Sequence, residues 1–151
     1  MRPLFLLGIE LQVYPAGQQL TAQAAVPLAE SHALTVDVGI NRARRRDWAL
    51  HDDERGAGPG GGIAYRFQPA ALVVEARADV WWLPINWTQG DQTGRTNTLV
   101  AQPSARLGWS VDAGPLTVEP GISLGWEINV VTRGEPVGQG AILLGGIGIW
   151  R

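Results

Sequence analysis

The segment LVVEARADVWW, residues 72–82, decides the fold of this chain. From Val74 onward every second residue is apolar, and the residues between them include Glu75, Arg77 and Asp79. Successive side chains of a β-strand point to opposite faces, so the segment predicts a strand with one apolar and one charged face. A helix would mix both kinds of residue on every side.

The same alternation recurs along the 151 residues, a length that fits one domain. No stretch keeps a helical period, so we expect an all-β chain. Most of the predicted strands exceed the roughly 5–6 residues of an ordinary strand and approach the roughly 9–11 residues of a transmembrane strand. The eight predicted strands cover residues 4–14, 20–28, 34–41, 62–68, 72–82, 99–111, 116–130 and 140–150.

The connections differ in length. The longest, residues 44–60, 88–98 and 131–137, follow the third, fifth and seventh strands, and short turns follow the second, fourth and sixth. This arrangement predicts a single closed up-and-down antiparallel barrel, with both termini at the end of the short turns. We expect the last strand to pair antiparallel with the first, since an open edge leaves backbone groups unpaired. The glycines expected to permit a close seam there are Gly140, Gly145, Gly146 and Gly148.

The composition excludes several classes of function. The chain has no Cys and its 12 basic residues are all Arg, so disulfides, thiolate metal sites and lysine Schiff bases are excluded. The net charge of −2 argues against nucleic-acid binding through a basic surface. We expect no cofactor and no metal. Charged residues make up only 17%, against roughly 25% in soluble domains, yet no window reaches the roughly 18 apolar residues of a spanning helix. We interpret the start of the chain as mature sequence behind an initiator Met.

These features resemble the small eight-stranded outer-membrane β-barrels of Gram-negative bacteria. The resemblance covers nearly the whole chain and implies a transmembrane barrel with short periplasmic turns, longer external loops, an apolar outer band and aromatic girdles. It also implies membrane lipids and lipopolysaccharide as surroundings, with other envelope proteins as further candidate partners. Val36, Val74, Leu107 and Leu124 should then be exposed, although they are apolar.

Aromatic residues fall near the ends of the predicted strands, where tryptophan and tyrosine favour the membrane interfaces. The outer belt is predicted at Trp81, Trp82, Trp87 and Trp126. The inner belt is predicted at Phe67, Trp109 and Trp150, with Tyr65 and Phe5 beside them.

Charged residues share the opposite face and are predicted to fill the barrel interior as a paired network. An eight-stranded barrel is just wide enough for side chains to fill it, and buried charges are tolerated when they are paired. We therefore expect no open pore. Arg77 and Arg106 should each lie near one of the acids. The predicted network comprises Glu10, Asp37, Arg66, Glu75, Arg77, Asp79, Arg106, Glu119 and Glu127.

The connection 44–60 holds a candidate surface binding loop. Its arginines suit lipopolysaccharide phosphates and its acids suit a divalent cation, but the simpler interpretation, which we prefer, is a solvated loop whose charges pair locally. The glycine-rich stretch 56–62 is either a flexible lead into the fourth strand or a close-packed part of it. The loop residues are Arg44, Arg45, Arg46, His51, Asp52, Asp53 and Glu54, with Arg42, Asp47 and Trp48 nearby.

We therefore interpret the chain as a non-enzymatic outer-membrane barrel with a structural or complex-forming role in the envelope. One alternative is a lipid-modifying outer-membrane enzyme, for which Ser31, His32 and His51 offer the candidate groups. Ser31 and His32 are neighbours, however, and neighbours on a strand point to opposite sides. The other alternative is a soluble lipocalin-like barrel that binds an apolar ligand, in which the apolar face would point inward.

Overall fold

The computed structural model describes residues 6–46 and 49–151. The predicted start of the first strand at Leu4, the inner-belt residue Phe5, and Asp47 and Trp48 of the predicted loop lie outside these residues. The described part of the chain contains no helix long and apolar enough to cross a membrane. Its strands are β1 (Leu6–Tyr14), β2 (Gly17–Ala29), β3 (His32–Arg46), β4 (Asp53–Phe67), β5 (Leu72–Gln89), β6 (Gln92–Trp109), β7 (Val111–Ala113), β8 (Leu116–Arg133) and β9 (Gly140–Trp150).

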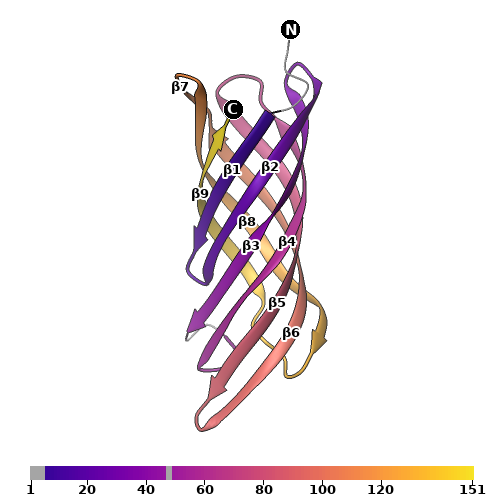
Figure 1. The fold of residues 1–151 in the computed structure, drawn as a ribbon, viewed down its shortest axis with the longest axis vertical. Coiled ribbons are helices and arrows are strands. Elements are labelled where there is room, and N and C mark those ends of the chain that lie inside the picture. Colours follow the sequence, from indigo (N-terminus) through magenta and orange to yellow (C-terminus); the bar gives the residue numbers. More distant parts are fainter. Residues whose placement is uncertain (1–5, 47–48) are drawn as a thin grey trace.

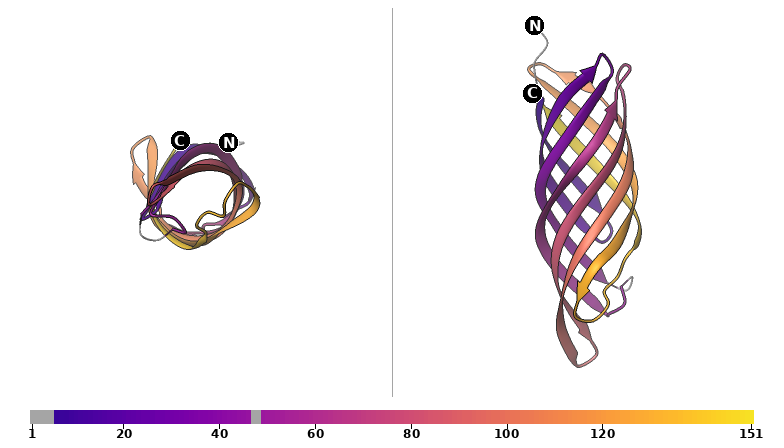
Figure 2. Two further views of the ribbon diagram at one scale, coloured as in Figure 1. Left: turned by 90° about the horizontal axis from the view of Figure 1, so that it is seen from below. Right: turned by 90° about the vertical axis from the view of Figure 1, so that its right-hand side faces the viewer.

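The strands form one antiparallel ring, as the alternating connections predict. Their order is β6-β5-β4-β3-β2-β1-β9-β8-β7, and a β6–β8 pairing closes the ring (Figures 1 and 2). β7 is a short strand that pairs with the start of β8 and flares away from the wall. Arg151 lies at one end of the barrel, here called the terminal end, and the long β5–β6 hairpin marks the opposite, hairpin end.

The seam between β1 and β9 confirms the predicted closure. The two strands pair antiparallel, from Gly8 opposite Trp150 to Val13 opposite Gly145. A methyl group at Gly8 would lie 2.7 Å from the Trp150 ring, and one at Gly146 would lie 3.0 Å from a side chain of β1. The prediction that glycine is needed for a close seam is wrong at Gly140 and Gly145, where an added methyl group would meet nothing within 4 Å.

β4 is longer than the sequence pattern predicts, because the glycine-rich stretch belongs to it. The strand runs 15 residues from Asp53, so the predicted connection 44–60 shrinks to residues 47–52. Gly56, Gly58, Gly60 and Gly62 all occupy inward positions. A methyl group at Gly60 would collide with Trp81 of the neighbouring strand. The glycines therefore let the β5 backbone and its inward side chains approach closely, and their lack of side chains hides the alternation.

The predicted connection 88–98 is also mostly strand. β5 and β6 pair continuously from Leu72–Trp109 to Gln89–Gln92, so only two residues remain for the turn. Gly90 there has a φ of 54°, which glycine adopts without strain. The hairpin extends beyond the other connections at this end (Figure 1). Its side chains are mostly polar on both faces, which removes the hydrophobic alternation.

The two faces of the wall are inverted relative to a soluble barrel. The outward side chains of Val36 and Leu124 are 46% and 64% exposed, while the inward Arg77 and Arg106 are 7% and 3% exposed. Val74 and Leu107 are exposed as well. This geometry confirms the predicted direction of both faces and contradicts the soluble barrel with an apolar interior.

Candidate functional site

The candidate site is the interior of the barrel, where polar side chains from most of the wall strands meet. Alternation along each strand places one side chain in two on this side. All nine charged residues of the predicted network are buried there: Glu10, Asp37, Arg66, Glu75, Arg77, Asp79, Arg106, Glu119 and Glu127. They fall into three groups along the barrel.

The central group is built around Arg77. Its guanidinium lies 2.5 Å from Glu10 Oε2 and 2.9 Å from Asp37 Oδ2, and its Nε lies 3.7 Å from Asp79 Oδ2. Arg106 approaches the other side of Glu10, with Nε 2.9 Å from Oε1. Both arginines therefore lie beside acids of the network, as predicted, and Glu10 joins them.

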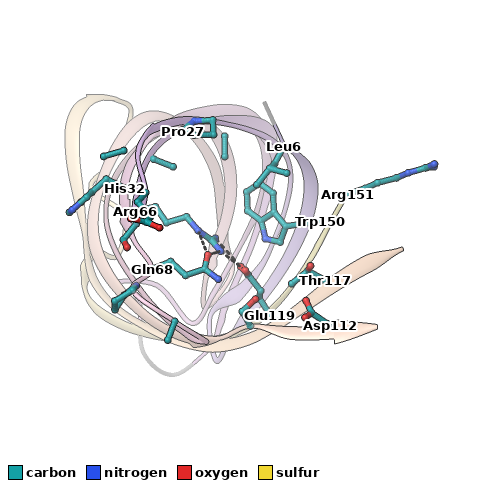
Figure 3. Close-up of a pocket in the computed structure, with 18 of the residues that line it drawn as sticks. Leu6, Pro27, His32, Arg66, Gln68, Asp112, Thr117, Glu119, Trp150 and Arg151 are labelled. Carbon is teal, nitrogen blue, oxygen red and sulfur yellow. Dashed lines mark hydrogen bonds and ion pairs between the residues drawn. The ribbon is translucent and has the colours of Figure 1, made fainter. Parts of the chain in front are cut away.

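The group nearest the terminal end is built around Arg66 (Figure 3). The guanidinium donates to Glu119 and, at 3.2 Å, to Glu75. It also donates to Gln68 Oε1 at 2.7 Å and lies 5.0 Å from the centre of the Trp150 ring. Arg66, Gln68, Glu119 and Trp150 line the inner part of a cavity of about 520 Å³ that opens at this end. The Arg66 guanidinium already donates to several protein acceptors. We therefore interpret it as a group that closes the inner end of the cavity, and not as a binding site for a ligand.

The group nearest the hairpin end is built around Arg45, which lies 2.7 Å from Glu127 Oε2 and 3.3 Å from Glu54 Oε2. The Tyr14 hydroxyl lies 3.3 Å from Glu127 Oε1, and His51 Nδ1 lies 3.0 Å from Glu54 Oε1. Arg45 and Glu54 are 5% and 1% exposed. Their prediction as surface loop residues is wrong, because β3 and β4 continue through both positions and turn them inward.

The other residues of the predicted loop have separate positions. Arg44 and Arg46 face outward from β3, and Asp53 lies between two exposed arginines of β3 and β4. Asp52 is exposed and accepts a hydrogen bond of 2.8 Å from the backbone N–H of Gly90. The seven residues therefore do not form one binding loop.

Neutral amides fill the space between the charged groups, and the sequence reasoning missed them. Gln19 Nε2 donates to Gln102 Oε1 at 2.7 Å, and Gln23 Nε2 donates to Glu10 Oε2 at the same distance. Gln12 is buried beside them. The sequence did contain a signal for them, because these glutamines alternate along their strands on the same face as the charged residues.

An apolar cluster fills the interior at the hairpin end, and it too was missed. Trp81, Leu83, Ile85 and Val100 are each at most 1% exposed and pack together with Val137. Val137 comes from the β8–β9 connection, whose next residue, Gly138, donates its N–H to both Glu54 oxygens at 3.2 and 3.1 Å. The connection therefore folds into the barrel mouth. The signal in the sequence was that residues 80–85 are apolar on both faces.

Comparison with known proteins supports this architecture at the level of the fold. No family model and no curated protein matches the chain. Among solved structures, a major outer membrane protein from Thermus thermophilus superposes with a TM-score of 0.59 at 14% identity, over 97% of each chain. The chain has the fold of the small outer-membrane β-barrels.

Two further outer-membrane barrels agree. The N-terminal β-barrel domain of Pseudomonas aeruginosa OprF gives a TM-score of 0.57 at 14% identity, over 97% of this chain and 96% of that chain. Ail, the attachment invasion locus protein of Yersinia pestis, solved in complex with the heparin analogue sucrose octasulfate, gives 0.57 at 7% identity over the same shares. At these identities the likeness concerns the fold alone.

The aromatic belts of this outer-membrane-type barrel are partly as predicted. Trp82 and Trp126 near the hairpin end, and Phe67 and Trp109 near the terminal end, are exposed on the outer surface, as is Tyr65. The prediction is wrong for Trp81, Trp87 and Trp150, which share the inward parity. Trp81 and Trp150 are buried, and Trp87 is half-buried and stacks on His51 at 4.3 Å.

The two histidines occupy opposite ends of the barrel. His32 starts β3 at the terminal end, where its Nδ1 lies 2.6 Å from the Tyr65 hydroxyl and its ring 4.9 Å from that of Phe67. His51 belongs to the group around Arg45. Within residues 6–46 and 49–151, no cluster of His, Asp and Glu side chains is arranged to hold a metal ion.

Proposed function

We propose that this chain is an integral outer-membrane protein of a bacterial envelope, with a sealed lumen and a non-enzymatic structural or complex-forming role. The observation that carries the proposal is the two-part seal of the interior. Most of the charged side chains and amides occupy the section whose outer face is apolar, and the cluster around Trp81 and Val137, together with the Arg45 group, occupies the hairpin end.

A membrane position is supported by the outer surface. Leucine, isoleucine and valine are exposed on the wall strands, and in lipid such side chains need no protein partner. The described wall strands also close into a ring in which each has a hydrogen-bonded neighbour on both sides, as a hydrocarbon environment requires. The hairpin end is assigned to the outside, because outer-membrane barrels carry their longer connections there.

A sealed interior makes passive transport an unsuitable role. A solute would have to cross the Arg77 group, where three carboxylates surround one guanidinium, and then the apolar cluster, from which water is excluded. What the barrel offers instead is a rigid wall in the membrane and a long polar hairpin, β5–β6, beyond it. We propose this hairpin as the surface for contact with other envelope components.

Ion conduction across planar lipid bilayers tests the proposal. The wild-type chain, folded into the bilayer, should give no stable conductance. A variant that loses both seals, Arg77→Ala/Arg106→Ala/Trp81→Ala, serves as the open control. Insertion is checked separately by the shifted electrophoretic mobility of folded against heat-denatured protein. A steady wild-type conductance comparable to that of the open control would contradict the sealed lumen.

A further inference from the structure

The outward face of β3 changes its chemistry abruptly along the strand. Its exposed apolar column ends at Ile40, and the next three outward positions are all arginine. Arg55 of β4 lies directly opposite the middle one in the strand register. We call Arg42, Arg44, Arg46 and Arg55 the β3–β4 arginine patch.

The patch presents its charges along one narrow surface. Alternate residues of a strand lie about 7 Å apart on the same face, and paired strands lie about 4.8 Å apart. The three β3 arginines therefore span about 14 Å along the strand, with Arg55 beside Arg44. A planar guanidinium offers its N–H groups as a fork, a geometry that suits phosphate oxygens.

The charge of the patch is mostly uncompensated. Arg55 and Arg46 share one carboxylate, Asp53, at 2.5 and 3.6 Å. The side chains of Arg42 and Arg44 make no ion pair with any residue that the structure describes. Four arginines and one aspartate leave a net charge of +3 on an exposed surface.

The neighbouring hairpin leaves the patch open on one side. β2 begins at Gly17, which pairs with Ala43, and the Arg44 N–H still donates to Ala16 O in the β1–β2 turn at 2.7 Å. From Arg45 onward β3 continues beyond this hairpin with a partner only on the β4 side. Figure 1 shows this hairpin ending well before the tips of β3 and β4. The ends of these arginines are therefore free to contact molecules that lie beside the wall.

We propose that the β3–β4 arginine patch binds the phosphate groups of a phosphorylated glycolipid in the outer leaflet, the chemistry of lipopolysaccharide. This inference rests on the proposed function, which places the hairpin end outside. A lipid is favoured over a soluble polyanion because Arg42 follows Ile40 on the same outward face, about 7 Å further along the strand. The guanidinium groups thus begin where the apolar band ends, at the depth of headgroups.

Native mass spectrometry of the full chain in detergent micelles tests the proposal, with bisphosphorylated lipid A and its dephosphorylated form as the two probes. The wild type should bind the phosphorylated form at least about tenfold more tightly, since several charge-assisted hydrogen bonds depend on the phosphates. The variant Arg42→Gln/Arg44→Gln/Arg46→Gln should lose this preference. The matched control Arg95→Gln/Arg133→Gln/Arg151→Gln removes three other exposed arginines and should keep it.

Several outcomes would overturn the proposal. Equal binding of the two lipid forms would do so, as would an unchanged preference in the triple β3 variant. Tighter binding of soluble sucrose octasulfate, with displacement of the lipid, would assign the patch to a soluble polyanion, and displacement by inorganic phosphate would assign it to free phosphate. Electrophoretic mobility distinguishes a failure of this inference from a failure of the proposed function. Protein that folds but shows no preference between the two lipids overturns only this inference. Protein that does not fold in micelles contradicts the proposed function.

Discussion

Replacement of Arg77 by leucine removes the cation at the centre of the lumen and leaves its acids in place. The Arg77 side chain is buried, and its guanidinium group lies beside three carboxylates. Glu10 keeps a second partner, because Arg106 lies 2.9 Å from its other oxygen. Among the ion pairs of the described residues, Asp37 and Asp79 have no cation other than Arg77. The variant therefore strands two buried carboxylates.

The expected cost follows from this geometry. Removal of one partner of a buried ion pair typically costs about 3–5 kcal/mol, because the remaining charge stays buried without compensation. With one acid still paired and two stranded, we expect the free energy of unfolding to fall by about 4 kcal/mol. The double variant Arg77→Leu/Asp37→Asn removes one stranded charge and should recover about 1–3 kcal/mol of that loss.

Urea unfolding of the chain folded into lipid vesicles measures these changes, and the seven tryptophans provide the fluorescence signal. Arg133→Leu is the control, because Arg133 is exposed and surface substitutions usually stay within about 0.5 kcal/mol of neutral. A loss below about 1 kcal/mol for Arg77→Leu, or a double variant less stable than the single one, would refute the view that paired charge holds the lumen together.

Four further substitutions test other parts of the barrel, by the same unfolding assay or by amide hydrogen exchange. Gly60→Ala should cost about 1–3 kcal/mol through a clash with a buried indole of β5, while Gly145→Ala, which meets no neighbour, should be nearly neutral. Leu124→Arg should cost roughly 2–4 kcal/mol in a bilayer; a near-zero effect at this 64% exposed residue would argue against a lipid contact. Glu54→Ala should raise amide hydrogen exchange in residues 134–139, and unchanged protection there would show that the connection is held by other contacts.

The sequence predicted the wall well because an exposed apolar outer face and a polar lumen impose strict alternation. The inward direction of Arg77 follows from this rule, and the closure of β9 on β1 follows from the cost of an open sheet edge. Alternation also decides the direction of tryptophans that the belt prediction placed on the outer surface from their position near strand ends alone. Trp81 and Trp150 lie near strand ends, yet their parity turns them inward. Strand ends alone do not define an interface belt; the parity must be outward as well.

The sequence predicted the strand lengths at the hairpin end poorly, because the two faces of these strands do not differ in polarity there. Alternation is visible only when the two faces differ in polarity. In β4 four inward positions are glycine, and in the outer part of the β5–β6 hairpin both faces are mostly polar. Both stretches therefore have the composition of loops, although β4 pairs with β3 as far as Asp53 and β5 with β6 as far as Gln92.

The change of chemistry along the barrel axis connects these observations. At the level of Arg77 the outside is apolar and the inside charged, as a membrane requires. At the level of Arg44 the outside is charged and the inside is mixed. One ladder row there carries Arg44 and Arg55 outward, while the rows on either side carry inward Ala43 with Ile85, and the ion pair of Arg45 with Glu54. The wall therefore has an apolar outer face in one section and a charged outer face in the next. In the proposed membrane position, the transition between Ile40 and Arg42 marks, on β3, where lipid tails give way to headgroups and water.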